Sequence, residues 1–145
     1  MKQTNILIVG VGGQGTLLAS VLLGNLGLSK GYDVKLSEVH GMAQRGGSVV
    51  THVKISEGTV SSPLIEEGDA DVIIAFEELE AYRWLPYLKK GGSVTVSSSP
   101  VKPVTDSLAD KPYSADDMIE FLEKQDIRLT VVDGGEIIRE AGSAK

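Results

Sequence analysis

The sequence predicts a single α/β domain over residues 1–145, with a Rossmann-like, mostly parallel sheet and helices on both faces. Two observations favour this class. Asn5–Val9 and Asp71–Phe76 are apolar runs rich in β-branched residues, as in parallel strands that are buried on both faces. Segments with helical character follow these runs, and strands that alternate with helices indicate a sheet covered by helices. A chain of 145 residues is long enough for one hydrophobic core.

The first half of the chain is predicted to contain a strand, a helix and two further strands. Asn5–Val9 leads into a glycine-rich turn, and Thr16–Leu26 after it reads as a helix. Strands are then expected at Tyr32–Glu38 and Ser48–Ile55, where apolar and β-branched residues gather again.

The strand at Asp71–Phe76 is followed by a cluster of glutamates at Glu77, Glu78 and Glu80. Negative charge in the first turn of a helix is favourable because it faces the positive end of the helix dipole. We therefore expect a helix that begins with a solvated acidic turn, not a metal site, and that ends within Pro86–Gly91.

The last third of the chain is predicted to add one more helix between two strands. Ser114 is a candidate N-cap with Asp117 three residues later, a variant of the capping box. The apolar residues behind Ser114 fall on one helical face. The elements expected here are a strand at Ser93–Val96, a loop at Ser97–Pro103, the helix after Ser114, a strand at Arg128–Val132 and a final helix that opens at Asp133-Gly134-Gly135.

Composition excludes several function classes. The net charge is −6 and the isoelectric point is near 4.9, so the chain lacks the overall basic surface of a nucleic-acid-binding protein. It has no cysteine, which excludes disulfides, catalytic thiols and iron–sulfur clusters held by its own thiolates. Two histidines are too few for a multi-histidine metal site.

The charge is uneven, because residues 1–56 carry a net +3 and the remainder −9, which favours an anionic ligand in the first part.

Nothing in the sequence predicts a membrane span or a targeting segment. Gln3–Ser29 carries no charged residue, but six glycines interrupt it. A spanning helix needs about 20 consecutive, mainly apolar residues, and a signal peptide needs a more basic start. We expect a soluble, cytoplasmic protein.

The glycine-rich turn is the first chemical signal. Gly10-Val11-Gly12-Gly13-Gln14-Gly15 matches the G-x-G-x-x-G pattern between a predicted strand and a predicted helix. Glycine allows a tight turn and lets a phosphate approach the N–H groups of the helix N-terminus. Glu38, at the end of the second strand, is placed where a ribose-binding acid would be expected. The alternative is that the glycines only allow close packing of strand and helix. The candidate cofactor-binding residues of this turn are Gly10, Gly12, Gly13, Gln14 and Gly15.

The predicted helix Thr16–Leu26 has no charged residue on any face. A helix on the surface of an α/β domain normally shows a polar side. We therefore favour a subunit interface on its outer face, with burial inside the domain as the alternative.

The second chemical signal is the polar, glycine-bearing segment Ser37–Ser48, which is expected at the same sheet edge as the glycine-rich turn. Arg45 is followed by Gly46 and Gly47, and a guanidinium group beside glycines is suited to hold a phosphate or carboxylate. His40 could transfer a proton near neutral pH. The alternative is a structural loop in which Arg45 pairs with Glu38.

These segments resemble a known family. The turn Gly10–Gly15, the loop Ser37–Ser48 and the strand entry Gly68–Asp71 together resemble the gamma-type domain of thiamine-dependent 2-oxoacid:ferredoxin oxidoreductases, and Glu38–Gly47 is the specific part of that loop. Within that family, the resemblance is greatest to the beta subunits of indolepyruvate:ferredoxin oxidoreductases. It extends over nearly the whole chain, and Arg45-Gly46-Gly47 is its most widely shared part. Chains of this family usually continue with another helical segment, so we expect a shortened form or a fragment.

The resemblance implies a heteromeric enzyme that converts a 2-oxoacid, coenzyme A and oxidised ferredoxin into an acyl-CoA, carbon dioxide and reduced ferredoxin. It places thiamine diphosphate and the 4Fe–4S clusters on a larger partner subunit, allows a contact with coenzyme A, and implies that the isolated chain is inactive. No residue is assigned as catalytic, and His40 and Arg45 are the only candidates. The residues that the resemblance places toward the shared site are His40, Gln44, Arg45, Gly46 and Gly47.

Two other functions remain open from the sequence. The glycine-rich turn and Glu38 would also suit a free-standing protein that binds NAD(P) or another nucleotide. A chain that has lost its partner subunit is the third possibility.

Overall fold

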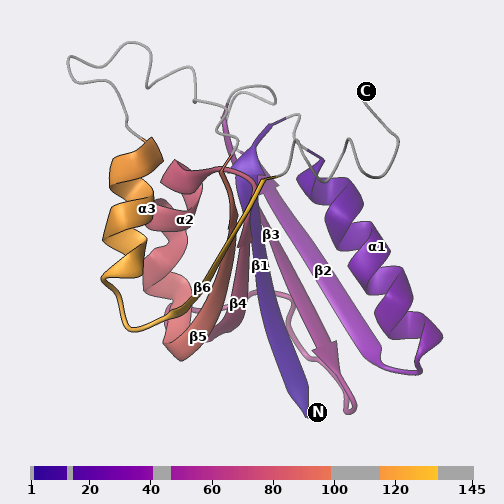
Figure 1. Cartoon of the computed structure of the whole chain (residues 1–145). Coiled ribbons are helices and arrows are strands. Elements are labelled where there is room, and N and C mark those ends of the chain that lie inside the picture. The colour runs from indigo at the N-terminus through magenta and orange to yellow at the C-terminus, as the bar shows by residue number, and fades with distance from the viewer. Residues whose placement is uncertain (1, 13–14, 41–46, 99–114, 134–145) are drawn as a thin grey trace.

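A computed structural model of the chain describes residues 2–12, 15–40, 47–98 and 115–133 (Figure 1). No helix in these ranges is long and apolar enough to cross a membrane. The elements, in chain order, are β1 (Gln3–Val11), α1 (Thr16–Ser29), β2 (Asp33–His40), β3 (Ser48–Ser56), β4 (Ala70–Ala75), α2 (Glu78–Trp84), a single 3₁₀ turn (Leu85–Tyr87), β5 (Leu88–Ser97), α3 (Ala115–Glu123) and β6 (Arg128–Val132).

The predicted fold class is confirmed. The six strands form one sheet in the order β2-β3-β1-β4-β5-β6. β1, β4, β5 and β6 are parallel neighbours, whereas β3 runs antiparallel to both β1 and β2. Every predicted strand is present, and the main differences are at the ends. β5 extends through Ser97 into the predicted loop, and α2 ends earlier than predicted, at Trp84. Ser114 and the predicted C-terminal helix lie outside the described residues.

Helices cover both faces of the sheet (Figure 1). α1 packs on one face, over β1, β2 and β3, and α2 and α3 pack on the other. The larger core lies under α2 and α3 and joins alternate residues of β1, β4 and β5, including Leu7, Ile73 and Val94. The smaller core lies under α1 and contains Ile6, Ile8, Val53 and Ile55. β1 is therefore buried from both sides, as its continuous apolar run predicts.

α1 lies close to the sheet because its inner face is small. A Cβ atom on Gly27 would come within 2.9 Å of Val34 Cγ2, and one on Gly24 would come within 3.4 Å of a Leu36 methyl group. The bulky side chains of α1 other than Leu23, which packs against the smaller core, project outward: Leu18 is 63% exposed and Leu22 60%. The uncharged helix predicted from the sequence thus presents an apolar surface to solvent, which we call the α1 leucine face. Its exposed residues are Leu17, Leu18, Val21, Leu22, Leu26 and Leu28.

A segment without regular structure, residues 57–69, runs from β3 to β4, and hydrogen bonds hold it to the sheet. The Val60 amide donates to Asp33 Oδ2 over 2.7 Å, and the Ile65 amide donates to Nδ1 of His52 over 3.0 Å. His52 is only 6% exposed. Burial, with a smaller effect of the nearby Lys54 charge, lowers the pKa of His52 below its usual 6.5. His52 is therefore neutral at pH 7, and its Nδ1 accepts a hydrogen bond.

This arrangement predicts a loss of stability in mild acid. The unfolded chain takes up a proton at His52 near pH 6.5, whereas the folded chain resists it until the lowered pKa is reached. The free energy of unfolding should therefore fall as the pH drops below about 6.5, by about 1.4 kcal/mol for each unit by which the pKa is lowered.

Urea unfolding at pH values between 7.5 and 5 measures this loss. The His52→Gln variant keeps an acceptor for the Ile65 amide but does not titrate, so its stability should fall less over the same range. Equal losses in the two proteins would show that groups other than His52 cause the acid sensitivity.

Candidate functional site

The sheet has a switch point between β1 and β4. These neighbouring parallel strands lead into helices on opposite faces, α1 after β1 and α2 after β4 (Figure 1). In open α/β sheets, ligands bind in the crevice that forms at the carboxyl ends of such strands. The Phe76 amide donates to the Val9 carbonyl over 2.9 Å, so the two strands are hydrogen-bonded up to their carboxyl ends. Gly12 after β1, the start of α2, the end of β2 and the start of β3 all lie at this edge.

The glycine-rich turn connects β1 to α1 as predicted. Gly10 is buried within β1, and Gly12 begins the turn. Gly15 is the N-cap of α1 with a φ of 88°, a conformation that glycine adopts without strain, and its carbonyl accepts the amide of Ala19 over 3.0 Å. The first turn of α1 contains no acidic residue, so the positive end of its dipole is not offset within the helix. Gly13 and Gln14 lie outside the described residues.

The connection between β2 and β3 emerges at the same edge, which confirms that prediction. His40 is the last residue of β2, and Ser48 is the first of β3, opposite Val11 in the ladder with β1. The Gly12 amide donates to the Gly47 carbonyl over 2.9 Å and ties the connection to the glycine-rich turn. The candidates Gln44, Arg45 and Gly46 lie outside the described residues, as does the side chain of His40.

Glu38 is not beside the glycine-rich turn, because β3 lies between β2 and β1. Glu38 pairs with Thr51, and Thr51 pairs with Ile8. Two strand spacings, about 10 Å, therefore separate the Glu38 backbone from β1. In the usual dinucleotide-binding arrangement these two strands are neighbours. In addition, the Gly12 amide, which could have faced a phosphate, is bonded to Gly47. Both facts weigh against the dinucleotide interpretation.

The prediction of a solvated acidic turn at the start of α2 is wrong. Glu77, Glu78 and Glu80 are each at most 1% exposed. They follow β4 closely at the switch point. Glu77 is the N-cap of α2, and its Oε2 accepts the Glu80 amide over 3.1 Å. Their position after a buried parallel strand was the signal in the sequence that could have indicated burial at this edge. The helix-dipole argument alone does not distinguish buried glutamates from solvated ones.

Glu80 links α2 to β3. Its Oε2 accepts Ser48 Oγ over 2.6 Å and Trp84 Nε1 over 3.3 Å. Its Oε1 lies 3.4 Å from Arg83 Nη1, which forms an ion pair with it. Ser48 could not be predicted as a partner of Glu80, because residues 48 and 80 are distant in the chain. We call this arrangement of Gly12, Gly47, Ser48, Glu80 and Trp84 the edge clamp.

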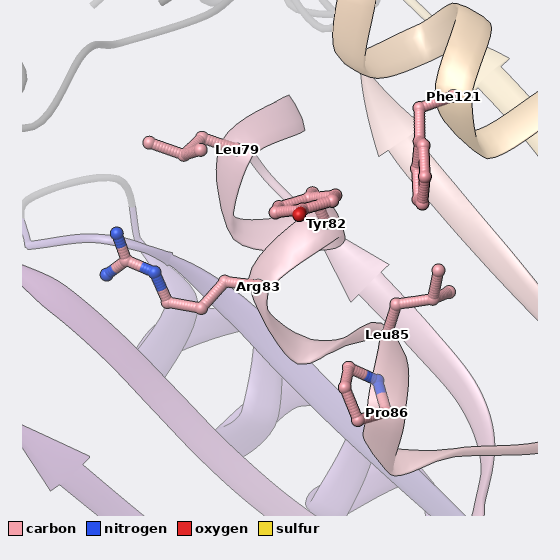
Figure 2. Close-up of a pocket in the computed structure, with 6 residues that line it drawn as sticks. All are labelled: Leu79, Tyr82, Arg83, Leu85, Pro86 and Phe121. Atoms are coloured by element: carbon pink, nitrogen blue, oxygen red, sulfur yellow. The ribbon is translucent and has the colours of Figure 1, made fainter.

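A surface groove of about 610 Å³ lies on the outer side of α2, against α3. Its walls are mainly apolar, and Tyr82 and Phe121 meet edge to face with ring centroids 5.1 Å apart. Figure 2 shows the Arg83 side chain extending away from Phe121. This groove contains none of the residues that the sequence singled out. Its lining residues are Leu79, Tyr82, Arg83, Leu85, Pro86 and Phe121.

The edge offers the N-terminus of α1 as a place for negative charge, with buried carboxylates on the opposite side of the switch point. Within the described ranges, no group of three or more histidine or carboxylate side chains is arranged to hold a metal ion. The sequence has no cysteine for an iron–sulfur cluster. The arrangement fits binding and orientation of an anionic group, and we derive no redox step from this chain's own residues.

Comparisons with known proteins agree on one family. Residues 5–145 match the family model of pyruvate ferredoxin/flavodoxin oxidoreductases. The chain is 43% identical to indolepyruvate oxidoreductase subunit IorB of Thermococcus kodakarensis over 145 residues, which is 99% of this chain and 71% of that protein.

Solved structures share the fold. The gamma subunit of a keto/oxoacid ferredoxin oxidoreductase from Geobacter sulfurreducens has a TM-score of 0.69 at 22% identity, covering 99% of this chain and 69% of that one. The 2-oxoglutarate:ferredoxin oxidoreductase of Magnetococcus marinus, with 2-oxoglutarate, coenzyme A and succinyl-CoA bound, has a TM-score of 0.70 at 15% identity. That match covers 99% of this chain and 22% of the other.

Proposed function

The chain belongs to the pyruvate ferredoxin/flavodoxin oxidoreductase family, and from this premise we propose that it is the small subunit of an enzyme that oxidises indolepyruvate and related aryl 2-oxoacids. The observation that carries the proposal is the 43% identity to an indolepyruvate oxidoreductase subunit along 99% of the chain. The chain is thus one subunit of a ferredoxin-dependent 2-oxoacid oxidoreductase, and the free-standing nucleotide-binding alternative is not favoured.

The proposed reaction is an oxidative decarboxylation. The 2-oxoacid loses its carboxylate as carbon dioxide, the remaining acyl group forms a thioester with coenzyme A, and the electron pair released passes to ferredoxin. Thiamine diphosphate and 4Fe–4S clusters, which supply the carbanion and electron-transfer chemistry, are assigned to a larger partner subunit. The lack of cysteine here supports that division.

We assign the α1 leucine face to the contact with the partner subunit. A row of leucines that are more than half exposed, on a helix without charge, is unusual for a surface that stays in water. Burying it in a heteromeric complex would remove that apolar area from solvent.

We assign the switch-point edge to the side that faces the shared active site. The N-terminus of α1 and the sequence Arg45-Gly46-Gly47 both suit an anion, such as a phosphate of coenzyme A or a carboxylate of the partner. His40 and Gln44 are proposed to border the same site. In this view the chain binds and orients, and it contributes no nucleophile.

Anaerobic capture of the tagged chain from its own cells, followed by mass spectrometry and by iron and thiamine assays, tests the proposal. The expected result is a larger subunit that contains thiamine and iron, in a complex that reduces ferredoxin with indolepyruvate and coenzyme A. A complex that uses only non-aromatic 2-oxoacids would contradict the substrate assignment. Capture of the chain without a partner, together with stabilisation by NAD, FAD or ATP, would favour the free-standing nucleotide-binding protein. The stabilisation expected in that case is about 2.7 kcal/mol at a hundredfold excess over Kd.

Charge on the α1 leucine face should prevent assembly. Leu18→Glu and Leu22→Glu are expected to abolish capture of the partner and to change the stability of the isolated chain by less than about 0.5 kcal/mol, because both side chains are exposed. Co-purification and urea unfolding measure the two effects.

Leu64→Glu is the matched control, because Leu64 is 52% exposed in the 57–69 segment and not on α1. It should leave assembly intact. If Leu18→Glu unfolds the isolated chain as strongly as it blocks assembly, α1 is ordinary core and the assignment is wrong.

Removing the Arg45 guanidinium should slow the assembled enzyme. A hydrogen bond to a charged group contributes about 1.5–3 kcal/mol, so Arg45→Ala should lower kcat/KM for coenzyme A by roughly tenfold to a hundredfold. Assembly should be unchanged, and Arg45→Lys should recover part of the loss. Steady-state kinetics identical to those of the wild type would eliminate Arg45 as a site residue.

A further inference from the structure

The edge clamp joins three segments that are far apart in the sequence. The Gly12 amide from the turn after β1 donates to the Gly47 carbonyl over 2.9 Å. The next residue, Ser48, donates its hydroxyl to Glu80 Oε2 on α2 over 2.6 Å. Adjacent residues at the start of β3 are thus held from two directions, one bond from each side of the switch point.

Glu80 is an energetically unfavourable residue to bury at the start of α2. Its side chain is fully buried, and burial of a carboxylate is unfavourable unless hydrogen-bond donors surround it. An apolar residue at position 80 would fill the space between α2 and the sheet without that cost. Unlike an apolar side chain, the carboxylate makes directional contacts that orient its neighbours. Its Oε2 accepts from Ser48 and from Trp84 Nε1, while its Oε1 forms an ion pair with Arg83.

We infer that Glu80 is a positioning residue, which acts through Ser48 to fix the point where the β2–β3 connection enters the sheet beside the glycine-rich turn. This inference rests on the proposed function in one respect, namely that the switch-point edge faces coenzyme A. Two hydrogen bonds on consecutive residues set both the position and the direction of the chain at Gly47 and Ser48. A shift at this point moves Gly47 relative to the glycine-rich turn.

The edge clamp also contains a fluorescent residue, Trp84, that can report on its structure. Trp84 is the single tryptophan of the chain, and its indole N–H shares Glu80 Oε2 with Ser48. The tryptophan emission of the isolated chain therefore comes from the clamp alone, without any substitution to introduce a label.

The first test uses hydrogen exchange of the full chain and does not depend on the enzyme activity. Ser48→Ala should speed exchange of the Gly12 amide and of amides at the start of β3 by roughly tenfold or more, and should change the Trp84 emission spectrum. Ser48→Thr, which keeps the hydroxyl, should restore both.

Ser56→Ala is the matched control. Ser56 lies at the opposite end of β3, where its hydroxyl donates to the Lys2 carbonyl over 2.8 Å. That variant should leave the Gly12 amide and the Trp84 emission as they are in the wild type. Equal exchange at Gly12 in Ser48→Ala and wild type would overturn the inference.

The second test uses the complex with the partner subunit. Ser48→Ala and Glu80→Gln should raise KM for coenzyme A by about tenfold or more, because small displacements of a binding edge have large effects, while kcat stays within about twofold. KM for the 2-oxoacid should not change. An active wild-type complex whose KM for coenzyme A is unaffected by Ser48→Ala overturns the positioning role. An inactive wild-type complex contradicts the proposed function. In that case, the hydrogen-exchange result alone tests the positioning role of Glu80.

Discussion

The antiparallel ladder between β1 and β3 is the constraint on which the rest of the structure depends. It runs without interruption from the pair Gln3–Ser56 to the pair Val11–Ser48. Because side chains alternate between the two faces of a strand, a slip of one residue would exchange the residues of the two cores. The same register brings Gly47 opposite the turn that begins at Gly12. One ladder therefore fixes both the packing of the domain and the composition of the edge at which we place the site.

The switch-point edge has an asymmetric distribution of charge. On one side, the N-terminus of α1 carries the partial positive charge of its dipole and no acidic residue in its first turn. On the other side, three glutamates are buried where β4 meets α2. The N-cap bond of Glu77 and the donors around Glu80 hold two of these carboxylates in fixed orientations. On the proposed function, an anion at this edge lies toward α1 and away from the buried carboxylates of α2.

Much of the fold, but less of the site, could be predicted from the sequence. The strand at Asn5–Val9 and the helix after it were predictable because apolar periodicity and glycine are local signals, and the prediction is confirmed. The position of β3 between β2 and β1 was not, since strand order depends on long-range pairing. The ribose role expected for Glu38 fails for that reason. The burial of Glu80 was equally hidden, because its partner Ser48 is distant in sequence and a glutamate after a strand looks the same whether it is solvated or enclosed. The roles of Arg45 and its neighbours stay predictions.

The close approach of α1 to the sheet has a thermodynamic consequence for the assembled enzyme. Gly24 and Gly27 allow the helix to lie against Val34 and Leu36, and its leucines other than Leu23 point outward. A contact made by those leucines is dominated by apolar burial, and such contacts form with a negative heat-capacity change and weaken on cooling. On the proposed function, the two subunits hold together best at warm temperature, and an enzyme handled on ice is the one most prone to fall apart into chains that have lost their activity.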